Sequence, residues 1–501
     1  MGLFKKLRTL FDRWSKEEKS VDDAKRTDGN PEQTPARPAH SKPRKAEPPR
    51  YLVVGLDWGT SCTKVVIRDP YGPDSPAYLV NFGKLGDEEL RHLLPTCLFL
   101  SHNGEASLRE EHGWRSLTRL KLNLMEGKGS VSYGRFSACP KEIAALYLGL
   151  VLRYAREWFI RTHEDIYGTY EIEWQLNLGI PAASHDDVET CNTFREVALV
   201  GWQLSQHVTV TLEKAHDAFQ EVSDGTFDAG IADYNVNVVP EVAAQVVGYA
   251  QSNLRRKGLH LLIDVGAATL DVAGFILTER DGEDRYNILR AQVEPLGTTS
   301  LEQERWGALK KLASKVFSSR RAMDTWARKV TAARQNPMHK VHSDLREYFP
   351  CHVRSRISLG QQRSIEEDFQ ADCFKVLREV IADLRGNRDP NAPMWNQGLP
   401  IFLAGGGRSI KVYNRALANL NAWRDRHLRA HAFKVRSLPM PASLQSKYLR
   451  PEDAHRFSVA YGLSYPIDDI GVVKPPHRIA DLDLKVYRRR RYTYEDTKEW
   501  T

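Results

Sequence analysis

Two stretches of the sequence, about two hundred residues apart, repeat one chemical pattern. In each, a run rich in β-branched residues ends in an aspartate, turns at a glycine and returns as a second β-branched run. The aspartates are Asp57 and Asp264, and the turns contain Gly59 and Gly266. Such a hairpin presents backbone N–H groups to an anion and holds a carboxylate beside them for a cation. The repeat therefore predicts that two parts of the chain bind one phosphate–metal group from opposite sides.

Further residues with chemical potential lie at the ends of predicted elements. Glu241 follows Pro240 at the start of a predicted helix over 240–256, and Asp271 lies in the returning strand of the second hairpin. A predicted strand over 400–404 runs into a third glycine-rich turn, which ends at Arg408. Carboxylates beside glycine turns suit phosphoryl chemistry, which depends chiefly on positioning and on charge neutralisation.

The elements that must position these residues form two blocks, each a set of strands followed by a mixed α/β stretch. The first block has predicted strands at 51–67, 77–82, 96–101, 172–180 and 207–212, and predicted helices near 113–125 and at 139–163 and 185–202. The second has the hairpin at 261–277, helices within 299–335 and 364–386, and the strand at 400–404. Two such blocks predict an α/β protein with two related lobes.

Taken together and in this order, the three motifs resemble those of the actin, sugar kinase and heat-shock chaperone superfamily of ATPases. They are most similar to the nucleotide-binding domain of the seventy-kilodalton heat-shock chaperones. The first phosphate motif matches at 55–61, the second at 264–271 and the adenosine motif at 403–411. Shorter stretches at 239–244, 296–299 and 458–462 are similar to the connecting motif, to a turn in the second lobe and to the closing helix.

The resemblance covers about residues 51–465 and implies two ribonuclease-H-like lobes with a central nucleotide cleft, the actin-like ATPase fold. The implied organisation is a basic amphipathic helix at 1–16, a disordered linker at 17–50, lobe I at 51–256, lobe II at 257–445, a closing helix at 446–465 that returns to lobe I, and a tail at 466–501. The loosest support is in the peripheral regions 81–135 and 310–360.

The resemblance also implies ATP and Mg²⁺ as cofactors. Asp57 and Asp264 are expected to hold Mg²⁺ mainly through its water molecules. Glu241 and Asp271 are candidates for orienting the attacking water. Lys121 resembles the catalytic lysine near the γ-phosphate, although Arg119 or Lys64 could take that role.

The remaining candidate site residues line the nucleotide. Backbone N–H groups around Gly59, Thr60 and Ser61 are expected to hold the β- and γ-phosphates, with Gly266 and Thr269 in the matching turn of the second lobe. Gly405, Gly406 and Arg408 are expected to pass under the adenine and ribose, and Gly297 to line the opposite wall.

One departure from the family pattern concerns the second turn. Ala267 and Ala268 stand where the family usually has glycines. If either position needs a positive φ, a methyl group there costs roughly 1 kcal/mol or more. The acidic residues all remain, so the sequence favours an ATP-binding protein with slow turnover.

The two ends of the chain point to a partner. Residues 1–16 place Leu, Phe and Trp on one helical face and Lys and Arg on the other, which suits an anionic membrane surface or a groove on another protein. Packing on its own protein is the alternative, but the polar, Pro-rich stretch over 17–50 argues against it. The 36 residues of 466–501 are too few for a peptide-binding domain, and they include an Arg-rich run that could dock a partner.

Net charge, cysteine spacing and the length of apolar runs indicate the expected partner and compartment. The net charge of +8 is modest for 501 residues, so nucleic acid is not the expected partner. Six scattered cysteines without metal-ligand spacing favour a reduced, cytoplasmic compartment, and residues 1–16 add the expectation of peripheral contact with the inner membrane surface. Apolar runs stop short of the roughly 20 residues that a membrane span needs.

The sequence thus predicts a chaperone-like ATPase that acts as a nucleotide-dependent conformational switch for a protein partner. Two alternatives stay open: an actin-like protein that forms filaments, and a kinase for a sugar or small metabolite. ATP-dependent light scattering distinguishes the first from a switch, and phosphate release without an acceptor counts against the second.

Overall fold

The structure is a computed structural model that describes residues 48–133, 136–181, 187–336, 339–357, 365–428, 430–446 and 449–474. The described residues from 48 to 474 belong to one compact unit. The predicted helix at 1–16, almost all of the predicted linker and residues 475–501 of the predicted tail lie outside the described residues. Within the described ranges, no helix combines the length and apolar character needed to cross a lipid bilayer.

The chain is a mixed α/β protein with two large sheets. The first sheet contains β1 (Arg50–Trp58), β2 (Cys62–Arg68), β3 (Ala77–Leu79), β10 (Ile172–Ile180), β11 (Val236–Pro240) and β17 (Leu444–Gln445), and β4 (Leu94–Pro95) pairs with β2. Its strand order is β11-β10-β1-β2-β3-β17. The pairs β1–β2 and β2–β3 are antiparallel, whereas β1–β10 and β10–β11 are parallel.

The second sheet repeats this topology. It contains β12 (Gly258–Val265), β13 (Leu270–Arg280), β14 (Glu283–Glu294), β15 (Pro400–Ala404), β16 (Lys434–Arg436) and β18 (Val472–Lys474), in the order β16-β15-β12-β13-β14-β18. Again the first three strands along the chain form an antiparallel meander, and the next two join in parallel on the other side of the first strand. β1 and β12 therefore occupy equivalent places in the two sheets.

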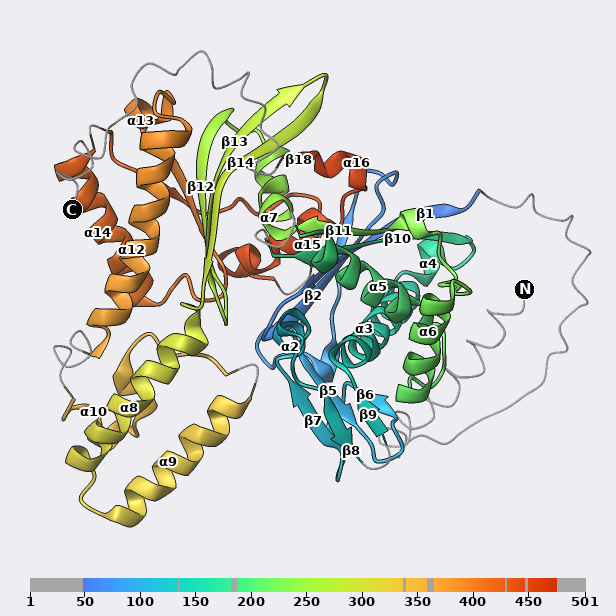
Figure 1. The fold of residues 1–501 in the computed structure, drawn as a ribbon, viewed down its shortest axis with the longest axis horizontal. Helices are drawn as coiled ribbons and strands as arrows, with labels where there is room; N and C mark the ends of the chain where they lie inside the picture. Colours follow the sequence, from blue (N-terminus) through green and yellow to red (C-terminus); the bar gives the residue numbers. More distant parts are fainter. Residues whose placement is uncertain are drawn as a thin grey trace, which may run out of the picture. The chain divides into compact units, whose positions relative to one another are not determined.

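Helices cover the outer face of each sheet. On the first sheet, Leu56 and Ile67 point into a buried cluster with α3 (Pro140–Thr162), α5 (Val188–Leu204) and α6 (Leu212–Asp224). On the second sheet, Ile263 and Val272 point into a cluster with α12 (Glu367–Asp383) and α14 (Lys411–His427). Figure 1 shows these two helical layers on their sheets. The alternation of side chains along each strand leaves a second apolar face on both sheets.

Two helices fill the space between the second faces. Val246 and Tyr249 of α7 (Glu241–Ala250) pack on the second sheet, and Ala460 of α15 (Ser458–Leu463) packs on the first. The two helices also pack against each other, so closely that a Cβ added at Gly462 would lie 1.8 Å from the carbonyl oxygen of Ala244. Both sheets thus share one continuous interior through α7 and α15.

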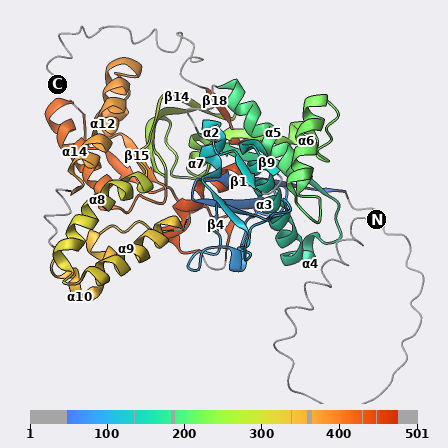
Figure 2. The same cartoon turned by 60° about the horizontal axis from the view of Figure 1, so that its bottom comes forward.

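Smaller elements surround this framework. On the side of the first sheet lie η1 (Gly83–Leu85), β5 (Cys97–Leu100), β6 (Ala106–Ser107), β7 (Arg115–Thr118), α2 (Leu120–Glu126), β8 (Val131–Tyr133), β9 (Phe136–Ala138), α4 (Glu164–Tyr167) and η3 (Asp233–Asn235). The second half of the chain adds α8 (Thr298–Val316), α9 (Arg320–Gln335), η4 (Leu345–Tyr348), α10 (Cys351–Arg354), η5 (Leu384–Arg388), α13 (Met394–Gln397), η6 (Pro451–Phe457) and α16 (Ile467–Ile470). Figure 2 shows α8, α9 and α10 gathered together.

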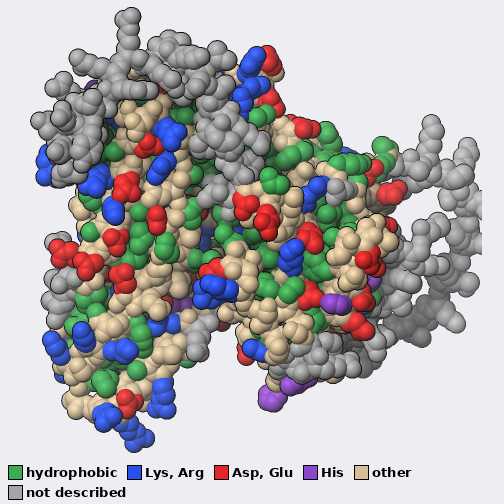
Figure 3. Space-filling model, viewed as in Figure 1, with side chains coloured by type: hydrophobic (Ala, Val, Ile, Leu, Met, Phe, Trp, Pro, Cys, Tyr) green, Lys and Arg blue, Asp and Glu red, His purple; other side chains and the backbone are tan. Residues whose placement is uncertain are grey.

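The helices α8 and α9 have a core of their own and a basic surface. Trp326 stacks on Phe349 with ring centroids 4.9 Å apart, inside a cluster of buried apolar residues. The exposed cations of the two helices are Lys310, Lys311, Lys315, Arg320, Arg321, Arg328 and Lys329. In the view of Figure 3 this region shows more blue than red side chains.

Several predicted elements are confirmed and two are wrong. The strands at 172–180 and 400–404 are confirmed as β10 and β15. The predicted helix over 113–125 is instead the strand β7 followed by α2, because 115–118 pairs with β5. The predicted strand over 207–212 is a turn that leads into α6, where Thr211 caps the helix by accepting a hydrogen bond from the N–H of Lys214.

The end of the described chain also differs from expectation. Within 446–465 only 458–463 is α-helical, and the tighter helix η6 precedes it. Residues 472–474, which the sequence analysis placed in the tail, form β18 and extend the second sheet beside β14. Parallel strand pairing needs a partner from elsewhere in the chain, so a short run such as Val472–Lys474 carries no local signal of it.

Candidate functional site

The first turn of the predicted site lies between β1 and β2. Asp57 is the next-to-last residue of β1, and only 6% of its surface is exposed. Its Oδ2 accepts a hydrogen bond from Nζ of Lys64 on β2 at 2.9 Å. Burial alone would lower the pKa of Lys64, but the Asp57 carboxylate outweighs it and the pKa is raised. Asp57 and Lys64 therefore form a charged pair at this end of the first sheet.

The backbone of this turn is held from one side. Thr96 donates from Oγ1 to the carbonyl of Gly59 at 2.8 Å and from its N–H to the carbonyl of Ser61 at 2.9 Å. Within the described ranges, no group accepts a hydrogen bond from the N–H groups of Gly59, Thr60 or Ser61. The carbonyls of Gly59 and Ser61 are thus satisfied while the N–H donors of the turn are open among the described residues, the arrangement that suits an anion.

The second turn is built differently. The N–H of Gly266 donates to the carbonyl of Thr269 at 2.9 Å, which closes the turn between β12 and β13. The carbonyls of Gly266, Ala267 and Ala268 accept hydrogen bonds from the N–H groups of Thr298, Thr299 and Gly297, at 2.8 to 3.1 Å. The second turn is therefore fastened to the start of α8.

Both unusual alanines fit this turn without backbone strain. Neither Ala267 nor Ala268 has a positive φ. A methyl group costs stability at a position with a positive φ, so the methyl groups of these two alanines carry no such cost. The tight position is Gly297 instead, where an added Cβ would lie 2.4 Å from the carbonyl oxygen of Ala267. Gly297 lines this turn because only a residue without a side chain can approach it so closely.

Asp264 is enclosed by two other elements. Its Oδ2 accepts a hydrogen bond from Nε2 of Gln245 on α7 at 2.8 Å. Gly405 lies against its other oxygen, since an added Cβ would be 2.1 Å from Oδ1. Gly405 also has a φ of +82°, which L side chains rarely adopt. The third glycine turn thus packs directly on the aspartate of the second hairpin.

A second charged pair joins α2 to α7. Nζ of Lys121 lies 2.5 Å from Oε1 of Glu241, and Lys121 is only 5% exposed. Arg119, the alternative cation two residues earlier, is exposed and has a φ of +58° at the start of α2. Of the three cations considered from sequence, the structure brings Lys121 and Lys64 to the carboxylates and leaves Arg119 outside.

The two aspartates of the second hairpin are held where ionisation is costly. Burial is the main cause that raises the pKa of Asp264 to about 6, and the charges of Glu241 and Asp57 add to it. Burial followed by the charge of Asp264 raises the pKa of Asp271 to about 7. Oδ1 of Asp271 is buried and has no hydrogen-bond partner within the described part of the chain. A carboxylate oxygen in that state has capacity for a cation, a water molecule or another donor.

The carboxylates do not form a direct metal cage. Among the residues that the structure describes, no three His, Cys, Asp or Glu side chains are arranged to hold a metal ion. The Asp57 and Asp264 carboxylates nevertheless come from opposite sheets and are close enough for their charges to act on each other. Such a donor set fits Mg²⁺, which binds one or two carboxylates and keeps several waters or phosphate oxygens.

Arg408, which the sequence analysis places under the nucleotide, makes two hydrogen bonds from the third glycine turn. Its guanidinium donates to Oγ of Ser437 at 3.4 Å and to the carbonyl of Glu452 at 3.1 Å. Gly406 is exposed, and the nearest group to an added Cβ there is the guanidinium of Arg456, at 3.9 Å. The turn thus presents Gly406 beside Arg456, while Arg408 ties it to η6.

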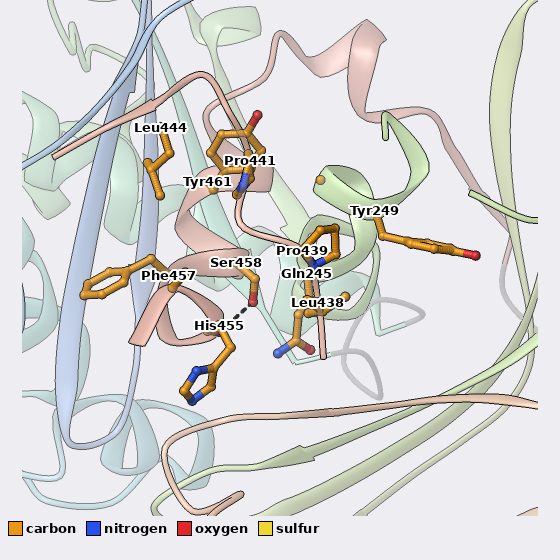
Figure 4. A pocket seen from close by; sticks show the side chains of 12 residues that line it. Gln245, Tyr249, Leu438, Pro439, Pro441, Leu444, His455, Phe457, Ser458 and Tyr461 are labelled. Carbon is orange, nitrogen blue, oxygen red and sulfur yellow. Dashed lines mark hydrogen bonds between the residues drawn. The ribbon is translucent and has the colours of Figure 1, made fainter. Parts of the chain in front are cut away.

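Two residues of the site carried no signal in the sequence. Gln245 lies one helical turn after Glu241, but only the packing of α7 on the second sheet brings it to Asp264. Arg456 lies in η6, far along the chain from the motifs. Gln245 and His455 also line a small pocket between α7, η6 and the segment 438–444, which Figure 4 shows from close by.

No protein-family model matches this sequence, and the search of curated proteins found no match.

Support for the site therefore comes from its geometry. The site lies where the two sheets face α7. It contains four carboxylates, two lysines paired with carboxylates, one amide side chain and three turns that carry glycines or hydroxyl groups. Such a set can hold a polyanion with a cation bound beside it, and can polarise a water molecule at a carboxylate.

Proposed function

We propose that the chain binds Mg-ATP between two ribonuclease-H-like lobes of the actin-like ATPase fold. The repeated strand order of the two sheets is the observation that carries this proposal, because it puts Asp57 and Asp264 at equivalent positions, next to last in β1 and β12. The proposed lobes are centred on these sheets, and the proposed closing helix is α15. The resemblance of the three motifs to those of the ATPase superfamily supports the same proposal.

In this proposal Asp57 and Asp264 hold Mg²⁺ through its waters, and the metal neutralises charge on the phosphates. The open N–H groups of Gly59, Thr60 and Ser61 hold phosphate oxygens. Lys64 and Lys121 are both engaged by carboxylates in the structure, so each can exchange one anion for another when a phosphate arrives. The nucleoside lies toward Gly406, where an added Cβ would meet only the Arg456 guanidinium within 4 Å among the described residues, whereas Gly297 and Gly405 pack closely on the second turn and on Asp264.

Asp271 is the favoured group for orienting the attacking water. Its Oδ1 has no partner, whereas Glu241 is already paired with Lys121. A carboxylate with a pKa of about 7 is well matched to accept a proton at neutral pH. About half of the molecules carry a protonated Asp271 at pH 7, so we expect turnover to rise as the pH increases above 7.

The proposed use of ATP is a conformational switch. Gln245 of α7 touches Asp264, and α7 packs tightly on α15, which lies on the first sheet. A ligand that draws Asp57 and Asp264 toward one metal ion would change the packing of these two helices. The partner that senses the change is a protein, contacted through residues 1–16 or the C-terminal tail.

The experiment is nucleotide binding and turnover by the full chain. Titration calorimetry with ATP and Mg²⁺ should give micromolar-range binding, and phosphate release should be slow but measurable. Asp57→Asn and Asp264→Asn should lower Mg-dependent turnover at least tenfold. Absence of binding to ATP, ADP and AMP in the presence of Mg²⁺ would refute the proposal.

A further inference from the structure

One cation beside the site, Arg456, has no partner among the residues that the structure describes. Arg456 is half-buried on η6, and none of the described residues accepts a hydrogen bond from it or forms an ion pair with it. Its neighbour Lys64 is paired with the Asp57 carboxylate, and the other lysine of the site, Lys121, is paired with Glu241. A guanidinium carries donors in a fixed fork that matches carboxylate and phosphate oxygens. A guanidinium without such a partner, beside the candidate site, is therefore able to bind an anion.

Basic side chains lie near Arg456. Its charge acts on Lys64 and on His455, and in both cases it disfavours the protonated form. Burial, followed by the charge of Arg408 and with Arg456 adding to it, lowers the pKa of His455 to about 4, so that His455 is neutral at pH 7. No acidic group compensates Arg456 by direct contact within the described ranges. Arg456 and Lys64 thus repel each other until an anion lies between them.

The position of Arg456 is well defined. Phe457 next to it is fully buried in the cluster that joins η6 to β2 and β3 of the first sheet. The carbonyl of Glu452 in the same element accepts hydrogen bonds from Arg408 at 3.1 Å and from the His455 ring at 2.8 Å. The guanidinium nevertheless reaches Gly406 at the end of the second sheet. Arg456 therefore spans from the core of one sheet to a turn of the other.

We propose that Arg456 binds a phosphate group of the ligand and makes the site selective for nucleoside phosphates over nucleosides. This inference rests on the proposed nucleotide site and adds a residue that the motifs do not contain. Because Arg456 is anchored on one sheet and reaches the other, the phosphate it binds also joins the two sheets. The phosphate replaces the missing counter-ion, so binding removes the repulsion between Arg456 and Lys64.

The test compares ligands that differ only in phosphate. Titration calorimetry with Mg²⁺ measures ATP, ADP, adenosine and inorganic tripolyphosphate on wild type, Arg456→Gln and Arg456→Lys. A charge-assisted hydrogen bond predicts that Arg456→Gln weakens ATP and tripolyphosphate binding by about 10- to 100-fold and adenosine binding by less than twofold. Arg456→Lys should recover part of the loss. Arg426→Ala, which removes an exposed arginine from the last turn of α14, is the matched control and should change nothing.

The outcomes separate the two proposals. Equal affinity of wild type and Arg456→Gln for ATP overturns the role of Arg456 while the nucleotide site stands. Equal losses for adenosine and ATP also overturn it, because they indicate a disturbed site. A further outcome is that wild type binds tripolyphosphate as tightly as ATP, with both affinities dependent on Arg456. That result supports the role of Arg456 and refutes the nucleotide proposal. Wild type that binds none of the four ligands refutes both.

Discussion

At the scale of single residues, the site combines groups that oppose stability when no ligand is bound. Asp264 and Asp271 lie partly buried beside each other and beside Glu241, so their ionised forms repel. Gln245 and the two lysines offset only part of this repulsion. Such a cluster is typical of sites where function is retained at the expense of stability.

The pH dependence of stability should report this cluster. The pKa of Asp271 is raised to about 7 from an ordinary value near 4, so the native state binds its proton more tightly than the unfolded chain. Stability from this group is therefore highest at low pH and is lost as pH rises toward 7. We expect Asp271→Asn to match wild type at pH 5 and to exceed it at pH 8, by on the order of 2 kcal/mol.

Urea unfolding at the two pH values measures this difference. Asp217→Asn, at an exposed position of α6, is the control and should not alter the pH profile. A variant at position 271 that is less stable than wild type at pH 8 would contradict the prediction. Its ATP turnover should fall even as its stability rises.

The pair of Asp57 and Lys64 makes a second residue-scale prediction. Both side chains are largely buried, at 8% and 14% exposure. Lys64→Met leaves the Asp57 carboxylate without its partner and should lower the free energy of unfolding by about 3 kcal/mol. The double variant Asp57→Asn with Lys64→Met should recover most of that loss, since neither charge is then buried. A double-mutant cycle by chemical unfolding measures the coupling, and additive losses would show that the pair does not interact.

At the scale of elements, the third glycine turn is defined by close contacts rather than by flexibility. Gly405 has a φ of +82°, and an added Cβ would lie 2.3 Å from the carbonyl oxygen of Val265. Gly406, next to it, has open space around the same position. Gly405→Ala should therefore destabilise the protein by at least about 2 kcal/mol, whereas Gly406→Ala should stay within about 0.5 kcal/mol of wild type. Thermal unfolding of the two variants makes the comparison, and equal stability would contradict it.

At the scale of the whole molecule, two sheets of the same topology are joined by α7 and α15. The close approach of Gly462 to Ala244 and the contact of Gln245 with Asp264 connect the first sheet to the second hairpin. A ligand held by both hairpins would stabilise this arrangement as a unit, since it binds the folded state alone.

Mg-ATP at about 100 times its dissociation constant should therefore stabilise the full chain by roughly 3 kcal/mol. The stabilisation should raise the unfolding temperature of wild type and leave that of Asp264→Asn unchanged. Light scattering in the same solution should stay flat for a switch and rise for a filament-forming protein. A rise in scattering that depends on ATP would favour the filament alternative.

How much of this protein can be predicted from sequence depends on whether the signal is local. β10 and β15 were predictable because short runs rich in apolar residues stop at Pro181 and Gly405. The run at 207–212 has the same local character, but Thr211 caps α6 and the segment has no strand to join as a ladder. β14, β16 and β18 depend on partners that only the folded chain supplies.

The same division holds for the site. The motif residues Asp57, Asp264 and Gly405 were identifiable because turns and strand ends need particular residue types at fixed spacing. Only the tertiary structure decided that Lys121 and Lys64, rather than Arg119, reach the carboxylates, and that Gln245 and Arg456 border them. Their places follow from the packing of α2, α7 and η6 between distant strands, and long-range packing leaves no fixed spacing in the sequence.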